Sequence, residues 1–387
     1  MYRFCIDRDE IVQMLNLVSP AIAVGSTFNP ILKSVLIEVV PEGLSVRASN
    51  SLVDIRVFSK YSFDVSSAFS FCVDSILVGL LQRMDPGEIR FDLSKKLSIS
   101  RGEKSYSLPV VDASQFPEFP KIEYDMSVSS SNLIEGFKRA AIGISQASDR
   151  PILQAYHLDE RGFVIASDGN QVSIFNLDFV GLDANIFAKG IDSVLSLLDR
   201  CETIQLGVSS SIGFKGDDWE AAIKLVSGDF PSKAADVVNS LVESSPVLTM
   251  SGEKSQLIQI LRICDLFSKR AFVEGKAYHT VFSLRNGRAI FSMNCPDLVE
   301  LQEVLDGFTF SGESEFEIWF QPSLLLEALE LVEGLVEIRF FGSLKPFLVF
   351  DKDSSDWKYL QVAMARAPSK DEERESKHND NGEEGDF

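Results

Sequence analysis

Apolar and polar residues alternate along two short segments near the middle of the chain, and a polar turn separates these segments. Phe163 and Ile165 occupy alternate positions before the turn, and Val172 and Ile174 resume the alternation after it. The turn itself, residues 167–170, reads Ser-Asp-Gly-Asn. A period of two on either side of such a turn predicts a β-hairpin over residues 161–175.

This hairpin pattern occurs three times along the chain. Residues 44–57 form one copy before it, and residues 288–304 form another after it. The copies lie roughly 120 residues apart, which indicates a repeated domain and not a solenoid of short units.

Helical patterns recur at the same interval. Ile11, Ile134 and Ile258 occupy one position of a first amphipathic helix in each repeat, and Asp74 and Asp192 begin matching second helices. The second helices are predicted over 74–83, 191–200 and 322–331, the last with Pro322 at its start, where a missing donor costs little. Strands predicted between them include 61–71, 88–93, 203–208 and 336–341. The fold class predicted is α+β, with three tandem repeats of two helices and about eight strands.

The repeat boundaries predict domains over residues 1–122, 123–244 and 245–366. Residues 367–387 differ in composition, because almost every residue is charged or small and acids outnumber bases. Such a segment cannot bury enough apolar surface to offset its ordering entropy, so we expect a disordered acidic tail.

Composition indicates an ordinary globular protein, and the net charge is −20. A surface this acidic repels nucleic acid on average, so any DNA-facing surface must be a local basic zone. No apolar run approaches the roughly 20 residues of a membrane helix, and the first residues lack a signal-peptide pattern. We therefore expect a cytoplasmic protein that does not engage membranes.

The sequence contains no catalytic constellation. Its three histidines, His157, His279 and His378, are far apart, and no nucleophile elbow, P-loop or zinc-protease motif is present. The acid pair Asp217-Asp218 fits a solvated turn better than a metal site. The five cysteines lie among apolar neighbours with no CxxC pair, which favours buried free thiols over metal or redox roles. We expect no enzymatic activity, no cofactor and no bound metal.

Tandem αβ units can pack into an arc, and two arcs joined head to tail can close into a ring lined by helices. The predicted helices and their flanks carry basic residues that could hold phosphates without reading sequence. Each single residue could equally be a surface charge that aids solubility, and Glu10, Glu135 and Asp199 balance part of the set. The predicted DNA-facing residues are Arg8, Arg83, Lys138, Arg139, Arg150, Arg200, Arg262, Lys269 and Arg270.

Several short motifs, in this order, resemble the bacterial sliding clamp family, the β subunit of the replicative DNA polymerase. They are 29–32 (Asn-Pro-Ile-Leu), 105–117, 166–169 (Ala-Ser-Asp-Gly), 224–231 (Lys-Leu-Val-Ser-Gly-Asp-Phe-Pro) and 364–366 (Met-Ala-Arg). The resemblance spans about residues 1–366. It implies a head-to-tail homodimer that encircles double-stranded DNA, confers processivity on a polymerase, and tethers a clamp loader and repair proteins through short peptides.

The resemblance also implies a hydrophobic pocket for those peptides between the second and third domains. Carried over position by position, the pocket residues are Leu153, Ser167, Gly169, Val172, Pro231, Leu324, Pro346, Leu360, Val362 and Met364. Polar parts of the family pattern are missing. The usual basic pair after the turn is Asn170-Gln171, and an expected Arg is Ala235. We expect weaker peptide binding or a different motif preference.

In the family, an edge strand of the first domain pairs with the third domain of the partner chain. This implies that Tyr106 and Leu108 lie near Leu266 and Phe267 in the dimer. For Leu266 and Phe267, an internal core position is an alternative. For the whole chain, the alternative function is a repeat-built protein-interaction scaffold that does not encircle DNA.

Overall fold

A computed structural model describes residues 2–65, 67–146, 149–231, 233–273, 279–295 and 299–364. The acidic segment predicted to be disordered, residues 367–387, lies outside these ranges.

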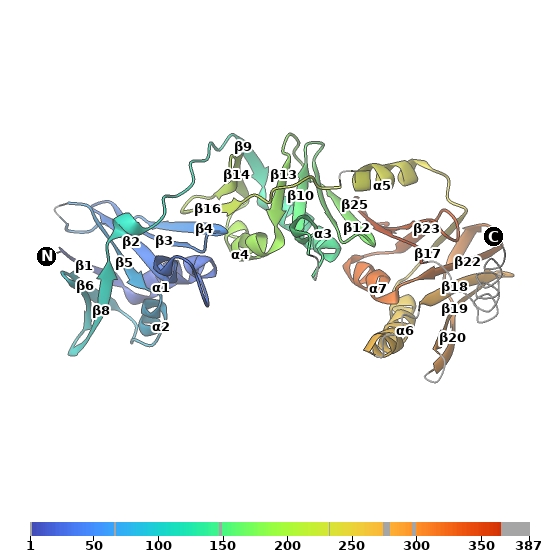
Figure 1. Cartoon of the computed structure of the whole chain (residues 1–387), viewed down its shortest axis with the longest axis horizontal. Coiled ribbons are helices and arrows are strands. Elements are labelled where there is room, and N and C mark those ends of the chain that lie inside the picture. The colour runs from blue at the N-terminus through green and yellow to red at the C-terminus, as the bar shows by residue number, and fades with distance from the viewer. Residues whose placement is uncertain are drawn as a thin grey trace, which may run out of the picture. The chain divides into compact units, whose positions relative to one another are not determined.

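The first repeat begins with a strand and a helix (Figure 1). The side chain of Asp7 accepts a hydrogen bond from the amide of Asp9 at 2.8 Å and so caps the first helix, which ends before Pro20. Asp74 likewise accepts from the Ile76 amide at 2.8 Å, so the second helix begins two residues later than predicted. The predicted strand over 61–71 begins only at Phe69. The elements are β1 (Tyr2–Asp7), α1 (Arg8–Val18), β2 (Ser34–Val40), β3 (Gly43–Ser49), β4 (Val53–Ser59), β5 (Phe69–Asp74), α2 (Ile76–Gln82), β6 (Glu88–Leu93), β7 (Lys96–Arg101) and β8 (Lys104–Val111).

The second repeat has the same order of elements. Its central hairpin, β11 and β12, confirms the prediction made for residues 161–175. The elements are β9 (Met126–Ser129), α3 (Ser130–Ala140), β10 (Ala155–Asp159), β11 (Phe163–Ser167), β12 (Gln171–Asn176), β13 (Ala184–Phe187), α4 (Ala188–Leu198), β14 (Thr203–Val208), β15 (Ser211–Lys215) and β16 (Trp219–Lys224).

The third repeat follows a helix that the sequence did not predict, α5 (Lys233–Glu243). Its first helix, α6, is longer than expected, and β21 is an additional strand. The elements are β17 (Leu248–Gly252), α6 (Ser255–Val273), β18 (Thr280–Arg285), β19 (Arg288–Cys295), β20 (Val299–Leu305), β21 (Thr309–Gly312), β22 (Glu315–Phe320), α7 (Pro322–Leu331), β23 (Val336–Phe340), β24 (Phe347–Asp351) and β25 (Ser354–Gln361).

The chain divides into two compact units. Unit 1 comprises residues 1–168 and 174–231, and unit 2 comprises residues 169–173 and 232–387. In unit 1, twelve strands follow the order β1-β6-β7-β8-β5-β2-β3-β4-β16-β15-β14-β9, and β13-β10-β11-β12 are neighbours elsewhere. β4 and β16 pair antiparallel, so the sheet of the first repeat continues into that of the second.

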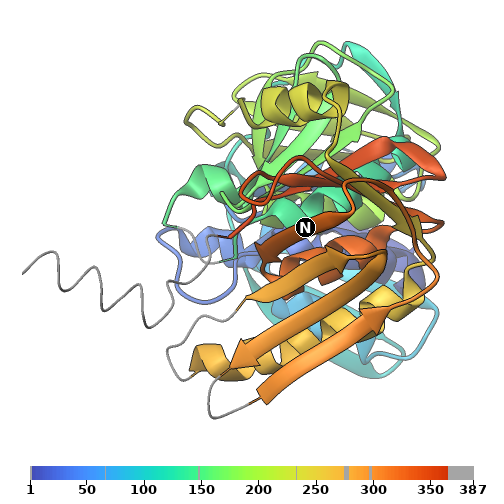
Figure 2. The ribbon, with the colours of Figure 1, turned by 90° about the vertical axis from the view of Figure 1, so that its right-hand side faces the viewer.

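In unit 2, β25-β24-β23-β17-β21 are neighbours, and the first residues of β12 lie beside β25. The other strands follow the order β20-β19-β18-β22. In Figure 2 these strands face the viewer, and α6 packs against β19 and β20. Among the described residues, no helix is both long and apolar enough to cross a bilayer.

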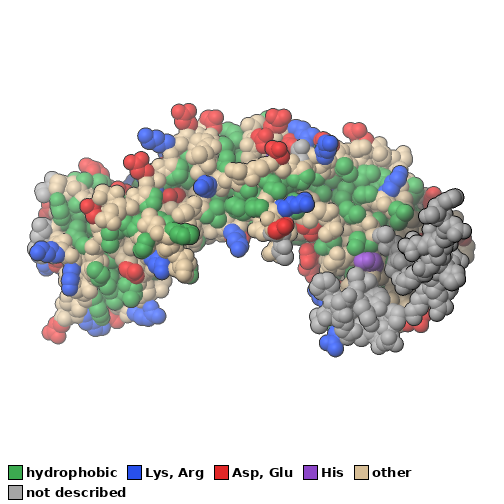
Figure 3. All heavy atoms as spheres, viewed as in Figure 1, with side chains coloured by type: hydrophobic (Ala, Val, Ile, Leu, Met, Phe, Trp, Pro, Cys, Tyr) green, Lys and Arg blue, Asp and Glu red, His purple; other side chains and the backbone are tan. Residues whose placement is uncertain are grey.

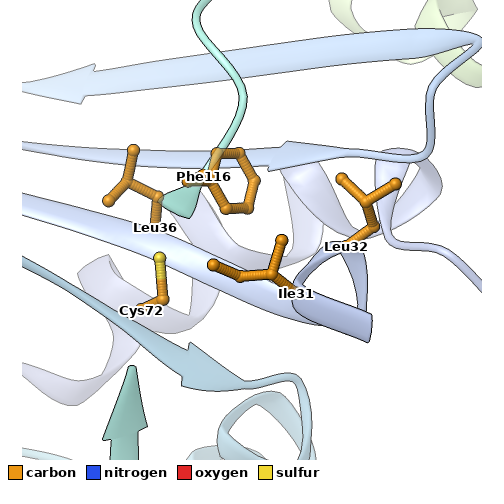
Figure 4. Close-up of a cluster of buried hydrophobic side chains, with 5 residues drawn as sticks. All are labelled: Ile31, Leu32, Leu36, Cys72 and Phe116. Carbon is orange, nitrogen blue, oxygen red and sulfur yellow. The ribbon is translucent and has the colours of Figure 1, made fainter. Parts of the chain in front are cut away.

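A small apolar cluster holds the start of β2 against the segment that leaves the first repeat. Figure 4 shows its members, Ile31, Leu32, Leu36, Cys72 and Phe116, which are all buried. Burial raises the pKa of the Cys72 thiol to about 12, so this cysteine behaves as a small apolar residue.

The other cysteines divide into two groups. Cys264 is also buried, and burial raises its pKa to about 11. The buried-thiol prediction is thus confirmed for Cys72 and Cys264. It is wrong for Cys5 and Cys201, which are half-buried because Cys5 lies on the edge strand β1 and Cys201 follows α4. The side chain of Cys295 lies outside the described residues.

Next to this cluster, an ion pair is buried in the first repeat. Arg47 Nε and Nη2 donate to the two Asp54 carboxylate oxygens at 2.6 and 3.0 Å, and both residues are under 10% exposed. The Arg47 guanidinium also lies over the Phe116 and Phe119 rings at 5.3 and 5.2 Å. The pair therefore ties β3 and β4 to the segment that follows β8.

We expect the Asp54→Ala substitution to destabilise unit 1 by about 3 kcal/mol, because it leaves the Arg47 charge buried without its partner. Urea unfolding followed by hydrogen exchange of β3 and β4 measures this cost. The matched control is Glu330→Ala, which breaks the exposed Arg262–Glu330 pair and should cost less than about 1 kcal/mol. Equal costs for the two variants would contradict a stabilising role for the buried pair.

Candidate partner-binding site

The turn between β11 and β12 presents the motif on which the predicted pocket depends. Gly169 is exposed and has φ = +96°, a conformation that glycine adopts without strain. Ser167 immediately before the turn is buried. The sequence therefore specifies both the turn and the direction of β12.

In unit 2, the residues after this turn run antiparallel to β25. The Val362 amide donates to the Asn170 carbonyl at 2.9 Å, and the Tyr359 hydroxyl donates to Gln171 Oε1 at 2.7 Å. This register places Val172 opposite Leu360, and both side chains are buried.

The same stretch of chain is held by α7 and β22. The Tyr359 hydroxyl lies 3.2 Å from the Leu324 carbonyl, and Gln361 Nε2 donates to the Gln321 carbonyl at 2.8 Å. The Met364 amide donates to the Trp319 carbonyl at 2.7 Å. Unit 2 thus brings together six of the predicted pocket residues, namely Gly169, Val172, Leu324, Leu360, Val362 and Met364.

Burial separates these residues into a floor and a rim. Val172 and Leu360 are buried, whereas Leu324, Val362 and Met364 are half-buried and retain accessible apolar surface. Pro346 is also half-buried and precedes β24, whose Phe347 pairs with Gln361. The arrangement can accept apolar side chains.

Two hydrogen bonds of polar residues in this region were not predicted from the sequence. Gln171 is only 3% exposed and accepts the Tyr359 hydrogen bond, so it supports the strand pairing from within. Trp357 Nε1 donates to Ser173 Oγ at 2.9 Å in the same layer. The sequence did offer one signal for these contacts. Trp357, Tyr359 and Gln361 alternate along β25, so they share one face of the strand, and all three are buried.

Unit 1 contains the other three predicted pocket residues, Leu153, Ser167 and Pro231. Leu153 lies in a 3-10 turn (Pro151–Gln154), and its carbonyl accepts from the Ser145 amide at 2.9 Å. Pro231 is exposed at the end of the loop that follows β16.

That loop is held by a buried histidine whose role the sequence did not indicate. His157 Nδ1 lies 3.0 Å from Asn185 Oδ1, and its ring stacks on Phe230 with centroids 4.7 Å apart. Asn185 Nδ2 also donates to the Gly228 carbonyl at 3.0 Å. The loop motif predicted the bend, but nothing local linked it to a histidine some 70 residues earlier in the chain.

The predicted DNA-facing residues are mostly exposed, but several are paired with acids. Arg200 pairs with Asp218 at 2.9 Å, Arg262 with Glu330 at 3.3 Å, Lys269 with Asp265 at 2.7 Å and Arg8 with Asp9 at 3.0 Å. Arg83 donates to the Gly79 carbonyl, and Arg83, Lys138, Arg150 and Arg270 are all exposed. Figure 3 shows acidic and basic side chains interspersed on the face in view.

Arg139 is an exception, and its interpretation as a surface cation is wrong. Its side chain is buried on α3, only 5% exposed, and Nε donates to Glu135 at 2.5 Å. The helical period places this position on the inner face of α3, next to Ala140.

The predicted dimer residues lie on accessible surfaces. In β8, residues 104–109 pair with β7, whereas the described pairing with β5 involves only Val110 and Val111, so Tyr106 and Leu108 lie on an open edge. On α6, Leu266 is 64% exposed, which excludes the internal core alternative for this residue. Phe267 is half-buried.

The repeated order of strand, helix, four strands, helix and three strands, with an apolar rim at β25, defines a three-repeat α+β clamp fold. The model of the DNA polymerase III beta subunit, N-terminal domain, matches residues 2–120. The beta sliding clamp of Bacillus subtilis (strain 168) is 21% identical over 375 residues, which cover 90% of this chain and 95% of that protein. The beta sliding clamp of Halalkalibacterium halodurans is 22% identical over 389 residues, which cover 92% of this chain and 98% of that protein.

Solved structures agree with these matches. The beta subunit of DNA polymerase from Streptococcus pyogenes superposes with a TM-score of 0.84 at 20% identity, covering 94% of this chain and all of that one. The DNA polymerase III subunit beta from Pseudomonas aeruginosa superposes with a TM-score of 0.84 at 21% identity, again covering 94% of this chain and all of that one. The chain is similar in sequence and in fold to the bacterial beta sliding clamps, and the resemblance found in the sequence is confirmed.

We expect the Asn185→Ala substitution to loosen the loop that carries Pro231, because it removes the hydrogen bonds to His157 and to the Gly228 carbonyl. Hydrogen exchange of residues 225–231 should accelerate by about tenfold, the effect of losing roughly 1–2 kcal/mol of local stability. Asn16→Ala, which removes the exposed Gln82–Asn16 bond, is the control and should leave this loop unchanged. Unaltered exchange in Asn185→Ala would show that Asn185 does not hold the loop.

Proposed function

We propose that this chain is a DNA-encircling sliding clamp that confers processivity on a replicative DNA polymerase and tethers replication and repair proteins. The observation that carries the proposal is the three-repeat clamp fold, which extends along nearly the whole described chain and matches clamps at 94% coverage. The work of such a protein is mechanical, so we propose a non-catalytic subunit that requires no cofactor and acts in the cytoplasm.

The proposed domains are residues 1–122, 123–244 and 245–366, and two chains would join head to tail. The open edge of β8 at Tyr106 and Leu108 supports this arrangement, because an unpaired edge strand is a template for pairing with another chain. Leu266 and Phe267 on α6 supply accessible apolar surface for the opposite side of the contact.

Contact with duplex DNA would be weak and independent of sequence. The six repeat helices of the described chain carry seven basic and seven acidic residues, so their net charge is zero, whereas that of the whole chain is −20. Such helices tolerate a polyanion without binding it tightly, which suits a protein that must slide. Exposed cations on these helices, such as Lys138 and Arg262, would supply transient phosphate contacts.

Partner proteins would bind through short peptides at the apolar rim formed by Leu324, Val362 and Met364. Because Asn170 and Gln171 stand where the family places a basic pair, and Gln171 is already bonded to Tyr359, the site offers little charge to a partner. We therefore propose a preference for apolar peptide side chains over acidic ones. The second candidate, a scaffold that never encloses DNA, is favoured by the acidic net charge alone.

A closed ring can leave a linear duplex but not a circular one. We expect protein assembled with a clamp loader on nicked circular DNA to stay bound during gel filtration, and to be lost within minutes once the DNA is linearised. Tyr106→Asp places a charge on the open edge of β8, so it should give a monomer by sedimentation and should not be retained on circles.

Equal loss of the wild type from circular and linear DNA would reject encirclement. A strictly monomeric wild type at micromolar concentration would favour the scaffold instead.

The peptide site predicts a second result. A labelled consensus clamp-binding peptide should bind the wild type, and Met364→Asp should weaken binding at least tenfold, because it introduces a charge at an apolar contact. Fluorescence anisotropy measures both affinities. Leu344→Asp, at an exposed leucine in the turn before β24, is the matched control and should bind within about twofold of the wild type. Equal affinity for wild type and Met364→Asp would exclude this site.

A further inference from the structure

The backbone geometry of the predicted peptide site occurs a second time, within unit 1. In unit 2, the Val362 amide donates to the Asn170 carbonyl at 2.9 Å; in unit 1, the Lys224 amide donates to the Leu52 carbonyl at the same distance. Each donor lies five residues after a fully buried tryptophan, Trp357 or Trp219. Each acceptor follows an Ala-Ser-x-x turn, residues 166–169 or 48–51.

The elements around this second site match as well. Ser51 has φ = +73°, the conformation that Gly169 adopts in the other turn. Phe116-Pro117 occupies the position of Phe230-Pro231 at the end of the repeat. Phe116 is anchored in the buried cluster shown in Figure 4, so Pro117 is held at a fixed place.

A cleft of about 250 Å³ lies at this position in unit 1. Its walls include the rings of Pro117 and Pro120, and Ala222 forms part of its floor. This volume is below that of a site for a drug-sized molecule, but it can accept one or two side chains of an extended peptide.

The side chains differ between the two sites, so the unit 1 site presents charged and polar groups where the unit 2 site presents apolar ones. Lys224 stands where the unit 2 site has Val362, and Ala222 stands where it has Leu360. Asp54 stands where it has Val172, but Arg47 neutralises this carboxylate through two hydrogen bonds. The exposed Lys224 is therefore the dominant charge, and four serines line the same cleft, Ser49, Ser51, Ser210 and Ser211.

We propose that this cleft is a second partner site, which binds an extended peptide segment through an acidic side chain. A carboxylate can accept hydrogen bonds from Lys224 and the serine hydroxyls while flanking apolar side chains contact the prolines and Ala222. A nucleic acid fits the cleft less well, because a chain of net charge −20 repels a long polyanion far more than a single carboxylate. The analogy rests on the proposed peptide site, but binding here does not require DNA or ring closure.

The test uses two labelled hexapeptides, Ala-Leu-Asp-Leu-Pro-Gly and the same peptide with Asn in place of Asp, titrated into the full chain at low salt. We expect the acidic peptide to bind about three- to fivefold tighter, the range of a partly exposed charge contact. Lys224→Gln should abolish this preference, and Lys95→Gln, at an exposed lysine in the β6–β7 turn, should preserve it. Ser210→Trp should obstruct the exposed rim and weaken both peptides at least tenfold.

A preference that persists in Lys224→Gln, unchanged affinity in Ser210→Trp, or no binding of either peptide at about 1 mM would each overturn the proposal. The consensus clamp-binding peptide separates the two sites. Its affinity should fall in Met364→Asp and remain unchanged in Lys224→Gln. If Met364→Asp has no effect but Lys224→Gln does, the proposed function fails at the first site while this inference stands.

Discussion

The fold depends on one repeated constraint: the last strand of a repeat pairs with the hairpin of the repeat before it. β16 extends the sheet beyond β4, and β25 runs beside the first residues of β12. In both places a backbone hydrogen bond closes the pairing at the hairpin turn, and a tryptophan of the closing strand is buried. Because a slip of one residue would move each tryptophan to the opposite face of the sheet, the register allows little variation.

Charge is distributed in a way that fits a mechanical role. The repeat helices are electrically neutral as a set, and the large negative charge of the chain resides on the remaining segments. Many of the basic side chains on and around the helices form ion pairs with neighbouring acids, such as Lys269 with Asp265. Exposed pairs of this kind contribute little to stability, but they keep the local potential low.

Local patterns predicted the repeats, the hairpins and most helices, because period, turn residues and capping residues act within a few positions of one another. The longer reach of α6 and the presence of α5 were missed, since neither depends on a strong local signal at its ends. Long-range partners were missed for the same reason. The stacking of His157 on Phe230 and the Tyr359–Gln171 bond join segments far apart in sequence. Arg139 was misassigned because the residue type alone does not show whether an arginine on a helix is exposed or is buried in a pair with a residue such as Glu135.

The two matched junctions separate what the backbone requires from what the side chains can vary. At both, the carbonyl of the residue that follows Ser51 or Gly169 accepts the bond from the closing strand, and both of these turn residues have a positive φ. A serine pays about 1 kcal/mol for that conformation where glycine does not. Side chains that do not take part in this pairing are not restricted in the same way. Hence one junction presents Leu360 and Val362, whereas the other presents Ala222 and Lys224. Two junctions with the same backbone pairing can therefore offer a partner either an apolar surface or a basic one.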